Sequence, residues 1–176
     1  MNAKRLYTEM NIVPLAKEVM YRHHDFLIDT ARQKNIPVQS ETMTINLIRG
    51  ITFGDIHLND SDRVELTEHS KNYRNCFSFL DWFKSVYGGT LYRVAIVLLP
   101  PEKQVYPHID FGSYYANKDR FHLVLNGIYD MIVDGERFRF EMGDLWWFDN
   151  KKTHSVINLS DTPRLSIIFD VEGCKW

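Results

Sequence analysis

The sequence predicts a mainly β protein with a helical N-terminal part, built as a jelly roll or a similar barrel with helices packed on one sheet. Two observations lead to this prediction. Apolar residues recur at helical spacing in the first half of the chain, whereas after Gly89 short runs of aromatic and branched residues alternate with turn residues. The length of 176 residues, with 44% hydrophobic and 25% charged residues, is that of one globular domain.

Two amphipathic helices are expected before residue 89. The first covers Pro14 to Lys34, where charged residues separate the apolar ones at helical spacing. The second covers about Asn75 to Val86 and is expected to stop at Gly88-Gly89, because glycine accepts the left-handed conformation at a helix end. The segment from Thr42 to Phe53 remains ambiguous between helix and strand.

Eight short strands are expected in the second half of the chain. The candidates are Leu91 to Leu99, Val105 to Asp110, His122 to Leu125, Tyr129 to Val133, Arg137 to Phe140, Leu145 to Phe148, His154 to Asn158 and Leu165 to Val171. Asn126-Gly127 and Asp134-Gly135 separate such runs, and both dipeptides favour tight hairpin turns. No repeat or Pro/Ser-rich linker interrupts the chain, so the helical and strand parts are expected to form one domain.

Charge and cysteine content limit the partners and the location of the protein. The formal net charge is −2 and both signs are mixed along the chain, which disfavours nucleic acid as a partner. Cys76 and Cys174 are far apart and predict neither a zinc motif nor a disulfide framework. The chain shows no signal peptide and no apolar run of the roughly 20 residues that span a bilayer. We therefore expect a cytoplasmic protein without a membrane partner, of unknown oligomeric state.

Three residues form a candidate metal site. His108 and Asp110 are two residues apart at the end of an expected strand, so their side chains project from the same face. His154 begins another expected strand and would supply the third ligand. Two histidines and one carboxylate leave three octahedral positions open, as in non-heme iron(II) oxygenases. The HxD pair is also common by chance, however, and a histidine on a strand is more often structural.

Arg164 begins the strand that follows His154, and its guanidinium suits a bidentate contact with a carboxylate. If the two strands form a hairpin with a three-residue loop, Asn158 pairs with Thr162, and His154 and Arg164 share a face. A loop longer or shorter by one residue would turn Arg164 away. The alternative role of Arg164 is that of a surface arginine.

Arg120 and His122 form a second i, i+2 pair on an expected strand. They would supply further donors for an anionic ligand, or Arg120 would form an ion pair at the sheet edge with a neighbour such as Asp119. The aromatic residues 146–148 lie just before His154 and would line a pocket or fill the core.

Taken together, these motifs resemble the aspartyl/asparaginyl β-hydroxylase family of 2-oxoglutarate oxygenases. The resemblance extends from about Tyr92 to Val171. It is carried by Tyr106-Pro107-His108-Ile109-Asp110, Arg120-Phe121-His122-Leu123, Gly143-Asp144-Leu145-Trp146, and Phe148-Asp149 through His154-Ser155-Val156-Ile157-Asn158 to Arg164. The ten-residue step from His154 to Arg164 matches the family's step from its second metal histidine to the arginine that binds 2-oxoglutarate.

The resemblance implies a cupin-like double-stranded β-helix as the catalytic core over residues 90–172, with residues 1–89 as a mostly helical lead-in that supports it. His108 and His154 would bind iron(II) in this core. Asp110 would complete the metal triad, at a position where some members of the family have glycine.

The resemblance also implies that Arg164, helped by Arg120 and His122, holds the co-substrate. Val97 stands where some members have a serine that contacts 2-oxoglutarate. The implied activity is that of an Fe(II)- and 2-oxoglutarate-dependent dioxygenase, which uses O2 to hydroxylate a C–H bond of a free amino acid or of a residue in a peptide or protein, and releases succinate and CO2. Two alternatives remain open, a cupin-like metal enzyme that does not use 2-oxoglutarate and a non-catalytic binding domain on the same barrel.

Overall fold

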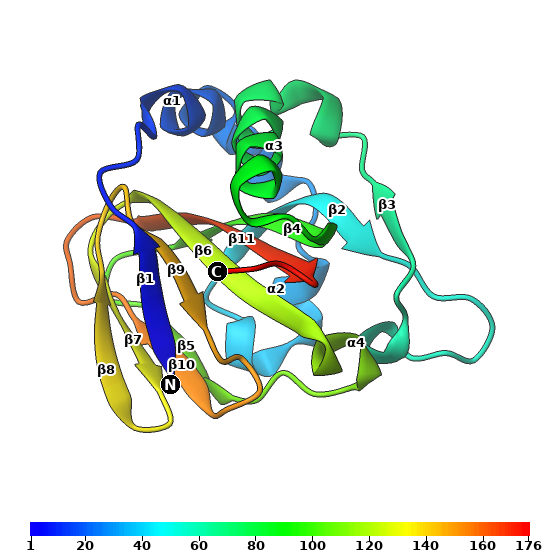
Figure 1. The fold of residues 1–176 in the computed structure, drawn as a ribbon. Helices are drawn as coiled ribbons and strands as arrows, with labels where there is room; N and C mark the ends of the chain where they lie inside the picture. The colour runs from blue at the N-terminus through cyan, green and yellow to red at the C-terminus, as the bar shows by residue number, and fades with distance from the viewer.

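Two β-sheets facing each other form the centre of the computed structural model, which describes residues 1–176 (Figure 1). The larger sheet has seven strands in the order β1-β9-β6-β11-β4-β2-β3, and the smaller has four in the order β5-β10-β7-β8. From β4 to β11, successive strands alternate between the two sheets, except for the β7–β8 hairpin. The fold is therefore the predicted double-stranded β-helix, mainly β with flanking helices.

The elements occur along the chain in the following order. They are β1 (Ala3–Tyr7), α1 (Val13–Tyr21), η1 (His23–Leu27), α2 (Ala31–Asn35), η2 (Pro37–Gln39), β2 (Met43–Gly50), η3 (Leu58–Asp60), β3 (Val64–Leu66), η4 (Ser70–Asn72), α3 (Arg74–Tyr87), β4 (Thr90–Leu99), β5 (Gln104–His108), α4 (Ser113–Ala116), β6 (Lys118–Asn126), β7 (Tyr129–Val133), β8 (Glu136–Phe140), β9 (Leu145–Phe148), β10 (His154–Ile157) and β11 (Arg164–Glu172). None of the helices combines the length and the apolar character that crossing a bilayer requires.

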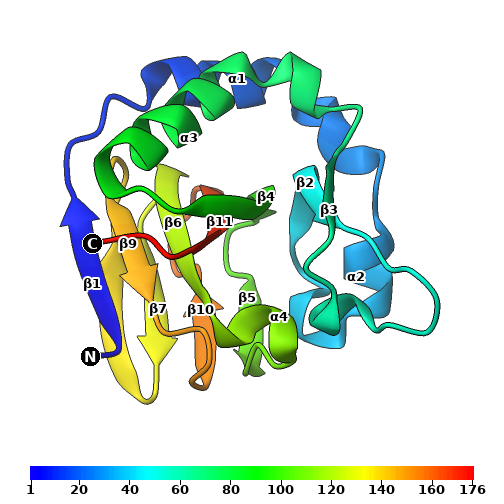
Figure 2. The same ribbon diagram turned by 45° about the vertical axis from the view of Figure 1, so that its right-hand side comes forward.

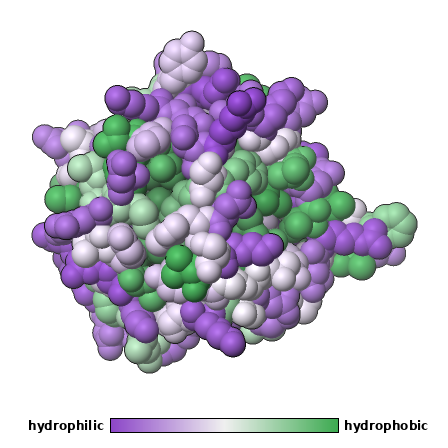
Figure 3. All heavy atoms as spheres, turned by 45° about the horizontal axis from the view of Figure 1, so that its top comes forward, coloured by the Kyte–Doolittle hydropathy of each residue, from purple (hydrophilic) through white to green (hydrophobic).

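Helices α1 and α3 lie over the outer face of the larger sheet (Figures 1 and 2). Their apolar faces and that sheet enclose the main core, in which Phe83 of α3 lies 4.8 Å from Phe121 and 4.9 Å from Phe169, between ring centroids. On the outside of this helical layer, hydrophilic and hydrophobic side chains are intermixed (Figure 3). The helices thus cover one face of the larger sheet and leave its other face for the smaller sheet.

A second core lies between the two sheets. Phe140 and Trp146 stack there at 4.5 Å between centroids, and Phe148 packs in the same cluster. Trp147 belongs to the main core on the helical side. All three aromatic residues before His154 are therefore buried, and they alternate between the two faces of β9.

The single helix expected from Pro14 to Lys34 is wrong, because the structure divides this segment into α1, η1 and α2. At Arg22 the backbone leaves the helical conformation, with φ −110° and ψ 26°. Asp25 is then buried and accepts a hydrogen bond from the Tyr73 hydroxyl at 2.9 Å. This contact joins residues far apart in the sequence, so helical spacing alone does not predict the break. Helix α3, in contrast, matches its prediction and ends at Gly88, where φ is +71°.

Residues 1–89 supply three strands in addition to helices, so a mostly helical lead-in describes them incompletely. Strand β2 occupies the segment that was ambiguous in the sequence and pairs with β4. Strand β1 pairs with β9 and forms an edge of the larger sheet. A five-residue edge strand has a weak sequence pattern, and its state depends on the neighbour with which it pairs.

The two Gly-containing turn dipeptides behave differently. Asp134 and Gly135, with φ values of 52° and 81°, form the predicted tight turn between β7 and β8. Asn126-Gly127 does not close a hairpin, because β6 and β7 belong to different sheets. A Cβ atom at Gly127, where φ is +82°, would lie 3.0 Å from the Pro163 carbonyl oxygen, so glycine suits the point where the chain crosses between the sheets.

Candidate metal centre

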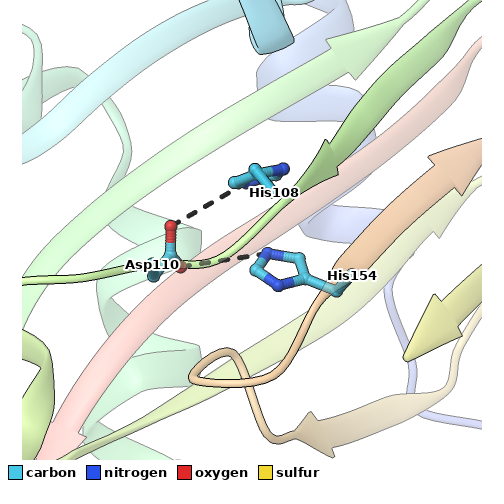
Figure 4. A group of neighbouring side chains, drawn as sticks. All are labelled: His108, Asp110 and His154. Atoms are coloured by element: carbon cyan, nitrogen blue, oxygen red, sulfur yellow. Dashed lines mark ion pairs between the residues drawn. The ribbon is translucent and has the colours of Figure 1, made fainter. Parts of the chain in front are cut away.

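His108, Asp110 and His154 converge on one point at the end of the smaller sheet (Figure 4). His108 ends β5, His154 begins β10, and the two residues are direct partners in this antiparallel pair. Asp110 follows β5, and its backbone N–H donates to the Asn150 carbonyl at 3.1 Å. The Asp110 carboxylate lies 3.8 Å from Nε2 of His108 and 4.0 Å from Nε2 of His154.

Backbone carbonyl groups hold both imidazole rings in one orientation. Nδ1 of His108 lies 2.7 Å from the Tyr106 carbonyl oxygen, and Nδ1 of His154 lies 2.9 Å from that of Lys152. A carbonyl oxygen can only accept, so each Nδ1 carries a proton, and in the neutral form of each ring Nε2 keeps a free lone pair. Outer hydrogen bonds of this kind orient histidines that bind metals.

The charge states of the cluster also suit a cation. Burial lowers the pKa of His154 to about 4 despite the nearby Asp110 carboxylate, so the ring is neutral at neutral pH. Burial acts to raise the pKa of Asp110, but the charge of Arg120 and the hydrogen bond from Asn150 help to outweigh it, and the pKa is lowered. Neutral imidazole and ionised carboxylate are the forms that bind metal, and a set of two histidines and one carboxylate fits iron(II).

A cavity next to this cluster contains a buried arginine without a carboxylate partner. Arg164 lines the cavity and is 1% exposed, and its Nε has no hydrogen-bond partner. Its Nη2 lies 3.4 Å from Nδ1 of His122, and its Cζ lies 4.6 Å from the centroid of the Tyr129 ring. A buried cation is stable only when it is paired or hydrogen-bonded, so the site favours an anionic ligand.

His122 is neutral beside Arg164. Burial, together with the charges of Arg164 and Arg120, lowers the pKa of His122 far below its usual value. Arg164 and the Tyr129 hydroxyl, which lies 3.3 Å away, both donate to Nδ1. The neutral ring then carries its proton on Nε2, which gives His122, a residue that lines the cavity, one N–H that is not used by Arg164 or Tyr129.

Residues 51–173, well over half of the chain, match the family model described as aspartyl/asparaginyl beta-hydroxylase. The chain belongs to this family. A structure described as an oxidoreductase of the 2OG-Fe(II) oxygenase family, from Burkholderia pseudomallei, is similar over 93% of this chain and 91% of its own, with 14% sequence identity and a TM-score of 0.53. At this identity the similarity shows a shared fold.

Two bacterial proteins of known structure are similar to a shorter part of the chain. One is a predicted oxalate decarboxylase from Thermotoga maritima, with 20% identity, a TM-score of 0.40, and 47% of this chain and 67% of that chain covered. The other is a cupin 2 conserved barrel domain protein from Salinispora arenicola, with 16% identity, a TM-score of 0.38, and 46% and 63% covered. The chain spans about two thirds of the length of each of these proteins.

In this member of the hydroxylase family, Arg120 lines the cavity but is already paired. It contacts Asp110, and its Nε and Nη2 donate to Asp170 at 2.8 and 3.0 Å. Asp170 lies opposite Arg120 in the pairing of β11 with β6. Asp119, the neighbour in sequence, instead accepts from the indole N–H groups of Trp147 and Trp176.

The hairpin expected between the strands of His154 and Arg164 is wrong. Strand β10 pairs with β5 and β7, whereas β11 pairs with β4 and β6 in the other sheet. In this fold β10 and β11 belong to different sheets, so they are not paired, and the length of the loop between them does not set which residues lie opposite each other. His154 and Arg164 nevertheless line the same cavity, because it lies between the sheets.

Several residues of the site carry no signal in the sequence. Arg32, Gln39 and Thr42 of the N-terminal part line the cavity. Asn150 donates to the Asp110 carboxylate at 2.9 Å. Arg32 lies in α2, after the break in the helix expected from Pro14 to Lys34, and its charge alone gave no reason to assign it to the site.

Proposed function

We propose that this chain is an Fe(II)- and 2-oxoglutarate-dependent dioxygenase, which hydroxylates a C–H bond of an amino acid or of an amino-acid residue in a peptide or protein. One observation carries the proposal: His108 and His154, which form a candidate metal site with Asp110, line the same cavity as the buried Arg164, which has no carboxylate partner. A cupin-like enzyme that used only a metal would have no need for this arginine. Membership of the hydroxylase family supports the same reaction class.

The residues of this chain divide the work of such a reaction. His108, Asp110 and His154 would hold iron(II), which supplies the chemistry that incorporates oxygen from O2 into a C–H bond. Arg164 pairs with the distal carboxylate of 2-oxoglutarate, and the Nε2–H of His122 adds a second donor.

Other residues in and next to the cavity keep the reacting groups in place. Arg120 and Asn150 keep the Asp110 carboxylate ionised and oriented. Val97, Met131 and Val156 give the cavity an apolar wall, which limits the access of water to the reacting groups. In this chain the position of Val97 provides no hydroxyl, so the contact with the co-substrate depends more heavily on Arg164.

The test is succinate release by the purified protein with Fe(II), ascorbate, 2-oxoglutarate and O2, in the presence of a panel of free amino acids and short peptides. We expect succinate to form in step with a hydroxylated product, and to disappear when Fe(II) is omitted. Binding of 2-oxoglutarate without any succinate would indicate a non-catalytic binding domain. Binding of iron without 2-oxoglutarate would indicate the cupin-like alternative, in which the metal serves another reaction.

A further inference from the structure

Three arginines line the cavity, and they differ in their partners. Arg120 is neutralised by Asp110 and Asp170. Arg164 and Arg32 form no ion pair with any carboxylate of the chain. The cavity therefore has two guanidinium groups without counter-ions, whereas 2-oxoglutarate has one distal carboxylate for an arginine to bind.

Arg32 is held in place by its own segment. Its Nε donates to the side-chain oxygen of Gln39, which is buried. The start of α2 is fixed by Asp29, whose carboxylate accepts the Ala31 N–H at 3.0 Å. A guanidinium with an oriented Nε presents its remaining N–H groups in a fixed direction, as binding of a carboxylate requires.

The same segment is attached to the strand that carries His108. The Glu41 carboxylate accepts the N–H of Gln104 in β5 at 2.7 Å. Thr42, which also lines the cavity, donates its hydroxyl to the Gln39 carbonyl at 2.8 Å. Helix α2 lies next to β2 (Figure 2), and η2, which carries Gln39, contacts β5. These contacts fix Arg32 relative to the candidate metal ligands His108, Asp110 and His154.

The electrostatic surroundings of Arg32 are unfavourable for a cation. Burial and the charge of Arg120 lower the pKa of Arg32, and Tyr115, Asp110 and Asp170 only partly oppose them. A bound anion would relieve this repulsion. Because Arg164 is already assigned to the co-substrate, the second anion is a different molecule.

We infer that Arg32, oriented by Gln39, binds a carboxylate of the substrate in the cavity beside the metal cluster. This inference rests on the proposed function and assigns a substrate class, molecules that carry a carboxylate near the C–H bond to be hydroxylated. Arg32 lies outside residues 51–173, which match the family model, so this contact belongs to the N-terminal part of this chain. The carboxylate has two sources, the α-carboxylate of a free amino acid or the side chain of an acidic residue in a peptide.

The experiment measures equilibrium binding without turnover. The protein is loaded with Mn(II) and 2-oxoglutarate in the absence of oxygen, and ligand binding is measured by calorimetry. The first set of ligands pairs each free L-amino acid with its α-amide. The second set pairs N-acetyl-L-aspartate methylamide with its asparagine counterpart. Arg32→Gln should weaken binding of the best ligand by about 30-fold or more, the typical cost of removing one member of a desolvated charged pair. Arg32→Lys should restore part of the affinity, because it keeps the charge and loses the planar fork.

Lys34→Gln is the matched control, since it removes a positive charge from the same helix at an exposed position. Lys34→Gln should leave the affinity for the best ligand within about twofold of the wild-type value. Arg32→Gln should likewise leave the affinity for 2-oxoglutarate within about twofold, because Arg164 holds the co-substrate. Loss of binding in the α-amide series identifies a free amino acid as the source of the carboxylate. Binding of the aspartate peptide analogue, but not of its asparagine counterpart, identifies an acidic residue in a peptide.

Three results would overturn the inference while leaving the proposed function in place. The first is that Arg32→Gln binds the ligand as tightly as the wild type. The second is that Arg32→Gln weakens the binding of 2-oxoglutarate and not that of the ligand. The third is that the wild-type protein binds none of the carboxylate-bearing compounds in the panel. Failure of the loaded wild-type protein to bind 2-oxoglutarate is a separate result. It would remove the proposed function, and this inference with it.

Discussion

Arg120 forms an ion pair with Asp110, the one acidic residue of the metal cluster. The side chain of Arg120 is 11% exposed and that of Asp110 is 9% exposed, so the pair is largely withdrawn from water. Arg120 also bonds to Asp170, which is 2% exposed. One guanidinium therefore forms ion pairs with two largely buried carboxylates, and it connects the candidate metal site to strand β11.

Replacing Arg120 should destabilise the fold. Arg120→Met leaves the carboxylates of Asp110 and Asp170 without their cation, and breaking a buried pair costs about 3–5 kcal/mol. Urea unfolding of the metal-free protein measures this loss. Arg137→Met is the control, since Arg137 is 61% exposed in its pair with Asp130, and it should cost less than about 1 kcal/mol. Equal losses in the two variants would show that Arg120 is not a structural cation.

His108→Ala and His154→Ala should each abolish the binding of one Fe(II) per chain, because each removes an imidazole whose Nε2 faces the cluster. Anaerobic titration followed by metal analysis measures the stoichiometry. His23→Ala, a change at an exposed histidine, should bind iron as the wild type does. Full iron occupancy in either cluster variant would refute the proposed metal site.

Arg164→Ala should weaken 2-oxoglutarate binding by about 30-fold or more, since it removes the buried guanidinium that we propose as the partner of the distal carboxylate. Arg164→Lys should recover part of the loss, and both variants should bind iron normally. The charge-transfer band of the iron-loaded protein reports the titration. If Arg164→Ala binds 2-oxoglutarate as tightly as the wild type, Arg164 is a structural residue.

The stability of the metal-free protein should fall as the pH drops below about 6.5, the ordinary pKa of histidine. The pKa of His122 is lowered in the folded state, so the unfolded chain binds more protons over the interval between the two pKa values. Stability then rises with pH in that interval, by up to about 1.4 kcal/mol per pH unit for one group, and it is lost as the pH falls. His154, with its pKa of about 4, contributes in the same direction.

Urea unfolding at several pH values between about 5 and 8 tests this expectation. His122→Gln should flatten the slope, because it removes one of the two groups. His23→Gln, at an exposed position, should leave the slope unchanged. A slope that His122→Gln does not alter would mean that His122 does not titrate as the structure indicates.

Local pattern was sufficient to predict most of the second half of the chain. Each of the eight expected strands is present, with ends shifted by a few residues, and Gly88 ends α3 as predicted. The spacing of His108 and Asp110 was enough to propose a shared ligand site, because side chains two residues apart on a strand project from the same face. These features depend on side-chain alternation and on turn residues, which are determined by a few neighbouring residues in the sequence.

Tertiary structure decided the rest of the site. Which sheet a strand joins depends on long-range pairing, so Arg164 reaches the cavity from the opposite sheet and not by the hairpin expected from its neighbours. Arg120 finds Asp170 through the pairing of β6 with β11, although the two lie 50 residues apart. Arg32 lines the cavity in a structure that divides the expected helix into α1, η1 and α2, and its Nε donates to Gln39, seven residues further along the chain. Each of these placements follows from contacts between distant segments, whose energies a local pattern does not contain.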